Sequence, residues 1–235
     1  MPPFPRRHLF LLGHLRSYSS VLSQTLGSHA QIDGYCETHT RYRTRLDLWR
    51  LHRRVRKLTG EPLDGDYVLD KILHDYPLAS SILASNRTRG IVLVRRPRDT
   101  VRSIIEMGFN DSHIAWHRDF DRVARYYETR LAELLRLCEA LRGRVVFLEA
   151  ESLLLNAREV LDQLAAFLQL QSPLQQECRI TVSARDSRTA VSLPRPLSIR
   201  LQNSYDFWCA AIRKSCPTIT VSGVASAEGD EKTNG

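Results

Sequence analysis

The chain has 235 residues, of which 43% are hydrophobic and 26% charged, and its formal net charge is +8. These values are typical of a globular protein with one main core, and no apolar run approaches the roughly 20 residues that a membrane-spanning helix requires. The five cysteines have no metal-ligand spacing, and the N-terminal apolar run is too short for a signal peptide. We therefore expect a cytoplasmic protein without a metal site, and the positive charge favours anionic partners such as nucleotides, nucleic acid, acidic sugars or membrane surfaces.

The first pattern along the chain predicts a strand, a turn and a helix. Leu9–Leu12 is an apolar run of the length of a buried strand, and Gly13–Ser17 has turn-like composition. Ser19 or Ser20 can cap the helix that follows. The amino end of such a helix directs free N–H groups and a positive dipole at the turn, and Arg16 adds side-chain donors. The pattern favours a loop that holds a phosphate or sulfate group; an ordinary strand and turn with incidental hydroxyls is the alternative.

A loop at residues 28–37 and a basic helix follow. Between residues 40 and 58 an apolar stripe recurs at helical spacing, at Leu48, Leu51, Val55 and Leu58. The other faces of this segment carry Arg41, Arg43, Arg45, Arg50, Arg53, Arg54, Arg56 and Lys57. We interpret these cations as a solvated helix face, and the alternative is a surface that attracts an anionic substrate.

The rest of the chain alternates between strand and helix patterns. Apolar runs predict strands at 67–73, 91–94 and 145–148, and helical stripes predict helices at 77–85, 97–107, 116–141 and 157–170. This alternation predicts an α/β fold with a mostly parallel sheet covered by helices on both sides. We expect one domain over residues 1–200 and a partly disordered C-terminal tail over 201–235, because the periodicity is lost beyond residue 171.

Polar clusters follow three of the predicted strands. They are Gly13–Ser20, Lys71–His74 and Arg95–Ser103. Because ligands of parallel sheets bind at the carboxyl ends of the strands, we expect these clusters to form one site. The first cluster does not match the phosphate-binding motif GxxxxGK[ST], and no acidic strand end is placed to supply a magnesium ligand, which disfavours ATP hydrolysis.

Three segments resemble the sulfotransferases that use 3′-phosphoadenosine 5′-phosphosulfate (PAPS). Leu15–Ser20 resembles the family's 5′-phosphosulfate loop, with Tyr18 where the family has glycine. Arg95 and Ser103 keep the spacing of the family's 3′-phosphate pair, an arginine at a strand end and a serine in the next helix. The segment that ends at Glu37 is similar to the one that follows the loop in protein-tyrosine sulfotransferases and their bacterial relatives.

This resemblance implies a sulfotransferase fold related to that of P-loop kinases, PAPS as co-substrate, and no metal. The residues that it assigns to the 5′-phosphosulfate are Arg16, Ser17, Tyr18, Ser19, Ser20 and Val21. Those that it assigns to the 3′-phosphate are Arg95 and Ser103. If the loop keeps the family's shape with Tyr18 in place of glycine, the tyrosine backbone must stay outside the left-handed region.

Sulfuryl transfer builds negative charge on the oxygen that bridges sulfur and the leaving phosphate, so positive groups there dominate catalysis. Arg16 and the loop amides suit this role, and Lys71 resembles the family's strand-end lysine. A base must also take the proton of the acceptor. Glu37 is our first candidate, by its family position, and His74 is the second, because cytosolic sulfotransferases use a histidine soon after the lysine.

Each of these assignments has a structural alternative. Arg16 can be a surface ion-pair partner, and Glu37 can be a helix-capping carboxylate. Lys71 can be a solvated strand-end side chain, and His74 can be a structural histidine. The other histidines that we considered show no ligand spacing and are expected in loops or at the surface: His14, His29, His39 and His117.

The sequence thus predicts a PAPS-dependent sulfotransferase that moves a sulfuryl group to a hydroxyl or amine acceptor, with no nucleic-acid partner and no membrane span. Two alternatives stay open. One is a small-molecule kinase on a related nucleotide-binding fold, which requires ATP and magnesium. The other is a non-catalytic basic module that binds an anionic polymer through residues 41–57. The motifs determine neither the acceptor nor the oligomeric state.

Overall fold

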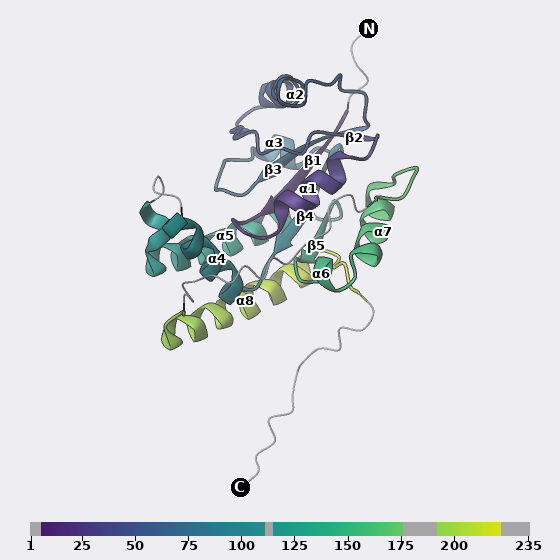
Figure 1. The fold of residues 1–235 in the computed structure, drawn as a ribbon. Helices are drawn as coiled ribbons and strands as arrows, with labels where there is room; N and C mark the ends of the chain where they lie inside the picture. The colour runs from purple at the N-terminus through teal and green to yellow at the C-terminus, as the bar shows by residue number, and fades with distance from the viewer. Residues whose placement is uncertain (1–5, 111–114, 176–191, 222–235) are drawn as a thin grey trace.

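A computed structural model describes residues 6–110, 115–175 and 192–221 of the chain. These residues form one five-stranded parallel sheet with the strand order β2-β3-β1-β4-β5 (Figure 1). The strands are β1 (Arg7–Gly13), β2 (Ile32–Asp33), β3 (Tyr67–Ile72), β4 (Thr88–Val94) and β5 (Val145–Glu149). The predicted α/β fold with a parallel sheet is confirmed.

Helices cover both faces of this sheet. They are α1 (Ser19–Gly27), α2 (Leu46–Thr59), α3 (Ser80–Leu83), α4 (Pro97–Asn110), the short 3₁₀ helix η1 (Ala115–Arg118), α5 (Phe120–Ala140), α6 (Ser152–Leu155), α7 (Ala157–Leu168) and α8 (Arg195–Ser215). The central strand β1 divides its side chains between two cores. Phe10 and Leu12 pack with α2, α3, α4, α5 and α8, whereas Leu9 and Leu11 pack with α1, α6 and α7. A strand buried on both faces reads as a continuous apolar run, as Leu9–Leu12 does.

The connections that leave the neighbouring strands β1 and β4 run in opposite directions across the sheet. The chain passes from β1 to β2 on one side and from β4 to β5 on the other, and ligands of parallel sheets bind where the connections diverge in this way. The strand ends are in register, with Leu12 opposite Ile72 and Gly13 opposite Leu93. A Cβ on Gly13 would lie 3.2 Å from the Leu93 carbonyl oxygen, so this close approach favours glycine.

Several element boundaries differ from the sequence prediction. The segment expected as a loop at 28–37 contains the two-residue edge strand β2, and the helix expected from residue 77 begins at Ser80. The long helix expected from residue 116 is divided, because the Asp119 carboxylate accepts the backbone N–H groups of Asp121 and Arg122 and caps a new helix there.

The inward stripe of α2 also differs at its end. Its buried residues are Asp47, Leu51 and Val55, which are spaced by four. Leu58 lies seven residues after Leu51 and so on the same side of the helix, but it belongs to the last turn and is 52% exposed. The apolar stripe predicted for this segment is therefore not buried at Leu58.

Helix α8 crosses the domain boundary that we expected at residue 200. Its buried residues Leu201, Tyr205, Cys209 and Ile212 recur every three or four positions and join the core that α5 lines. Beyond the helix, the Phe147 N–H donates to the Pro217 carbonyl at the edge of β5. The described residues 201–221 therefore pack with the domain, and residues 222–235 lie outside the described ranges. None of the helices in those ranges is long and apolar enough to cross a membrane.

Replacing Leu201 by alanine tests this packing of α8. Leu201 is fully buried, so Leu201→Ala is expected to lower the free energy of unfolding by about 2–5 kcal/mol through lost burial and the cavity left behind. Ile199→Ala, on the exposed side of the same helix, is the matched control and should change it by less than about 1 kcal/mol. Urea unfolding of the two variants gives the comparison, and equal losses would show that α8 does not pack on the core.

Candidate active site

The loop between β1 and α1 has an unusual backbone. Arg16 and Tyr18 both have left-handed conformations, with φ of 63° and 62°. Tyr18 is the residue that begins α1, and no side chain caps the helix, so the expectation that Ser19 or Ser20 caps it was wrong. Tyr18 is in the left-handed region, so the condition under which a tyrosine could follow the family's loop shape is not met. Each such residue costs about 1–2 kcal/mol, which the surrounding contacts must offset.

One of those contacts involves Arg95. Its guanidinium lies over the Tyr18 ring, 4.4 Å from the ring centroid, and it donates to the Arg16 carbonyl at 3.1 Å. On the other side of the loop, Arg16 Nε donates to Ser103 Oγ at 2.8 Å. The two residues expected to act as a pair, Arg95 and Ser103, therefore both contact Arg16.

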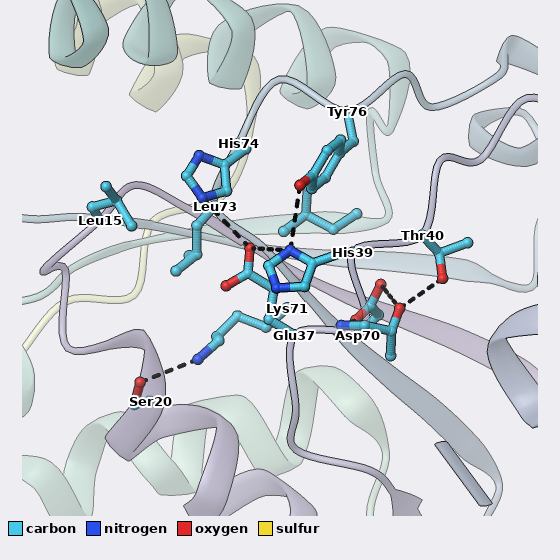
Figure 2. A network of polar contacts seen from close by, with 12 residues as sticks. Leu15, Ser20, Glu37, His39, Thr40, Asp70, Lys71, Leu73, His74 and Tyr76 are labelled. Atoms are coloured by element: carbon cyan, nitrogen blue, oxygen red, sulfur yellow. Dashed lines mark hydrogen bonds and ion pairs between the residues drawn. The ribbon is translucent and has the colours of Figure 1, made fainter. Parts of the chain in front are cut away.

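A third cation reaches the same helix end from β3. Lys71 Nζ donates to Ser20 Oγ at 3.1 Å (Figure 2). The three polar clusters that follow β1, β3 and β4 thus meet at the amino end of α1, where first-turn N–H groups lack helical partners. Positive side chains and free amides together form a surface suited to an anion.

The hydroxyl side chains of the loop are not equivalent. Ser17 is fully buried and its Oγ donates to the His14 carbonyl, so its hydroxyl is not available to a ligand. Ser19 is buried as well, whereas Ser20 is exposed beside Lys71. Val21 is half-buried and contributes its amide in the first turn of α1.

The two candidate bases lie in one cluster. Glu37 follows β2, and its Oε1 lies 3.6 Å from His39 Nδ1 and 3.9 Å from His74 Nε2 (Figure 2). This oxygen is buried and makes no hydrogen bond with the described residues. Burial lowers the pKa of His74, with the nearby Glu37 carboxylate acting in the opposite direction. Tyr76 completes the cluster, with its hydroxyl 3.3 Å from His39 Nδ1.

A buried carboxylate that the sequence reasoning missed holds the segment that carries Glu37. Asp70, on β3, accepts both the N–H and the hydroxyl of Thr38 at 2.9 Å, and the Tyr42 hydroxyl at 2.5 Å. Burial raises the pKa of Asp70 to about 6, and the hydrogen bonds oppose that rise. The sequence signal for this anchoring role was an acidic residue within an otherwise apolar strand, because a buried carboxylate requires hydrogen-bond donors.

Arg130 on α5 is a second buried group that sequence reasoning missed. Its guanidinium, 1% exposed, donates to the carbonyls of Gly13 at 2.7 Å and Ile72 at 2.9 Å, which end β1 and β3. Asp75 lies 3.3 Å from it. The buried charge is thus hydrogen-bonded and paired, as an interior cation must be.

Two tyrosines beside Arg130 hold the loops themselves. The Tyr126 hydroxyl accepts the Leu15 N–H and donates to the Leu73 carbonyl, each at 2.8 Å. The Tyr127 hydroxyl donates to the Arg95 carbonyl at 2.7 Å. Helix α5 therefore fixes the segments after β1, β3 and β4 at once.

His14 joins the ends of β1 and β4. Its Nε2 accepts the Arg95 N–H at 3.0 Å, so its proton is on Nδ1, which donates to the Leu15 carbonyl at 2.9 Å. His14 is fully buried, and burial lowers its pKa to about 4. His14 and His29 lie in loops, as expected, although both are buried, whereas His117 is buried in η1, so the expectation was wrong for His117.

The comparisons with known proteins agree with this fold. No protein-family profile and no curated protein matches the sequence. The structure is similar to a sulfotransferase from Alicyclobacillus acidocaldarius, at 14% identity and a TM-score of 0.58 over 89% of this chain and 95% of that one. It is also similar to the sulfotransferase domain from the curacin biosynthetic pathway, at 15% identity and a TM-score of 0.52 over 90% and 96%. The chain therefore has a sulfotransferase fold, as its motifs predicted.

The buried His14 predicts a specific dependence of stability on pH. Between its folded pKa of about 4 and its unfolded value of 6.5, the unfolded chain binds a proton that the folded chain does not. The contribution of His14 to the free energy of unfolding is therefore fully present above its unfolded pKa and is lost as the pH falls below it. We expect protonation of His14 in the unfolded chain to lower the free energy of unfolding by about 2 kcal/mol between about pH 7.5 and pH 5.

The difference between wild type and His14→Gln isolates this effect. Asp70, whose raised pKa acts with the opposite sign over the same range, is present in both proteins and cancels. Urea unfolding at the two pH values should show a smaller loss for His14→Gln than for wild type. The exposed His39, replaced by glutamine, should behave as wild type. Identical pH dependence in all three proteins would contradict the buried neutral state of His14.

Proposed function

We propose that this chain is a sulfotransferase that moves a sulfuryl group from PAPS to a hydroxyl or amine acceptor. The observation that carries the proposal is the meeting of Arg16, Lys71 and Arg95 at the amino end of α1, with Glu37 and His74 beside them. Cations and free amides at one point favour an anionic co-substrate, and a buried carboxylate beside them favours proton abstraction from an acceptor.

The anion-binding groups divide into two sets. Arg16, the exposed Ser20 hydroxyl and the first-turn amides of α1 up to Val21 would hold the 5′-phosphosulfate. Arg95 and Ser103 would hold the 3′-phosphate. On binding, Arg95 would donate to the phosphate in place of the Arg16 carbonyl, and the Ser103 hydroxyl would turn from Arg16 Nε to the phosphate. These residues fit an anion with two phosphate-bearing ends. PAPS supplies the sulfuryl group and a phosphate leaving group.

Lys71 and Glu37 take the two chemical roles in this proposal. Lys71 Nζ, already at the helix end beside Ser20, donates to the leaving oxygen as its negative charge grows. Glu37 accepts the proton of the acceptor through its buried Oε1, which is free of hydrogen bonds to the described residues. His74 is the second candidate base, and its lowered pKa keeps it neutral near pH 7. The two candidate bases lie next to each other, with Glu37 Oε1 3.9 Å from His74 Nε2.

The site favours this activity over a magnesium-dependent kinase. Asp70, the carboxylate within β3, already accepts three hydrogen bonds from Thr38 and Tyr42 and is buried away from the loop, so it is not placed to bind magnesium there.

The cysteines in the described ranges are free thiols, which supports our proposal of a cytoplasmic location.

Calorimetric titration with adenosine 3′,5′-bisphosphate, without magnesium, tests the co-substrate. Wild type should bind it, and Arg95→Ala should bind it about 10- to 100-fold more weakly, because a charge-assisted hydrogen bond to the 3′-phosphate is lost. Arg98→Ala, an exposed arginine in the next turn, is the matched control and should keep wild-type affinity. Binding of ATP with magnesium in place of the bisphosphate would favour the kinase.

Removing the proposed base separates chemistry from binding. Glu37→Gln is expected to lower kcat for sulfuryl transfer by roughly 10²- to 10⁴-fold, with unchanged affinity for the bisphosphate. The measurement uses radiolabelled PAPS with a panel of phenols, alcohols and amines. His74→Gln should have a smaller effect if Glu37 is the base. A wild-type protein that binds the bisphosphate but sulfates no member of the panel would contradict the enzymatic proposal.

A further inference from the structure

Helix α2 presents a charged face that the proposed reaction does not use. Its solvent-exposed residues Leu46, Trp49, Arg50, Arg53, Arg56 and Lys57 form what we call the cationic face. With 3.6 residues per turn they lie on the side opposite the buried Leu51 and Val55. In Figure 1, α2 lies at the outer margin of the molecule, and the exposure of these six residues shows that their face of the helix is turned to solvent.

The charge of this region is strongly one-sided. Asp47 is its only acidic residue between positions 41 and 57. That carboxylate is buried and accepts the backbone N–H groups of Arg43 and Thr44, with Arg50 at 2.5 Å as its ion-pair partner. Arg50 is thus compensated, whereas Arg53, Arg56 and Lys57 have no acidic partner among the described residues, and their charge favours a broad anionic surface.

Two large apolar side chains distinguish this face from a merely solvated helix. Leu46 is 72% exposed and Trp49 is 59% exposed, and they lie one turn apart at the start of the helix. The Arg53 guanidinium lies over the Trp49 ring, 4.8 Å from its centroid, so one ring face is covered and cannot stack on a nucleobase. Exposed tryptophan and leucine among arginines are typical of helices that lie at a membrane interface.

We propose that the cationic face docks on the surface of an anionic phospholipid bilayer. Leu46 and Trp49 enter the interfacial region, and Arg53, Arg56 and Lys57 contact the headgroup phosphates. Each of these cations strengthens binding to an anionic lipid surface by about fivefold. A soluble polyanion would satisfy the charges, but it leaves Leu46 and Trp49 in water.

Docking at this face also fixes the position of the active site. Arg54, on the flank of α2, donates to the Thr38 carbonyl and to Thr40 Oγ1, each at 2.9 Å. These residues directly follow Glu37 in the chain, and Asp70 anchors them to β3. The bilayer would therefore hold the base cluster at a constant distance from the membrane surface.

Sedimentation of the full-length chain with phospholipid vesicles tests the proposal. Wild type should bind vesicles that contain about a third phosphatidylserine and should not bind pure phosphatidylcholine. The double variant Arg56→Gln/Lys57→Gln should bind roughly 25-fold more weakly, since each cation contributes about fivefold. The control Arg125→Gln/Arg142→Gln removes the same charge from exposed sites on other elements and should bind as wild type.

The apolar contribution is tested separately. Trp49→Ala should weaken vesicle binding while keeping its sensitivity to salt, and Trp49→Phe should restore most of it. Unchanged urea unfolding of these variants shows that they are folded and keeps this test independent of the proposed reaction. The proposal is overturned if wild type does not bind the anionic vesicles, if the control pair loses as much as the test pair, or if inorganic polyphosphate binds where vesicles do not.

Discussion

The buried guanidinium of Arg130 joins the ends of the two strands that bound the candidate site. Parallel strands leave carbonyl groups unpaired where they end, and a helix packed over them cannot leave those groups dry without a large cost. Arg130 satisfies the carbonyls of Gly13 and Ile72 and shares its charge with Asp75. Arg130 therefore helps to set the distance between the loop after β1 and the segment after β3, which carry Arg16 and Lys71 toward each other.

The rest of the site extends this arrangement along α5. Tyr126 and Tyr127 hold the same two segments and the end of β4, and His14 ties β1 to β4 from within the core. These bonds offset the strain of the left-handed residues Arg16 and Tyr18 and hold the segments that carry the groups we propose for anion binding. Preorganised donors of this kind are what a reaction that develops negative charge requires.

The acceptor side of the site is built from the other edge of the sheet. Asp70 fixes the residues after Glu37, and Arg54 connects those residues to α2. The candidate base and the cationic face are thus parts of one hydrogen-bonded unit. If α2 rests on a bilayer, acceptors that partition into membranes become the natural class to examine, because the base cluster lies close to the surface that concentrates them.

The hydrophobic pattern of short segments was enough to predict the α/β class and most of the strands and helices. It also located the three polar clusters and the Arg95–Ser103 spacing, because periodicity and strand ends are properties of short segments. It missed α8, whose stripe includes tyrosine and cysteine, and it did not reveal that the Tyr127 hydroxyl donates to the Arg95 carbonyl. Only the tertiary structure decided the left-handed Tyr18, the tautomer of His14 and the pairing of Glu37 with His74. Each depends on a contact between segments far apart in sequence, and the register that creates such contacts exists only once the sheet has formed.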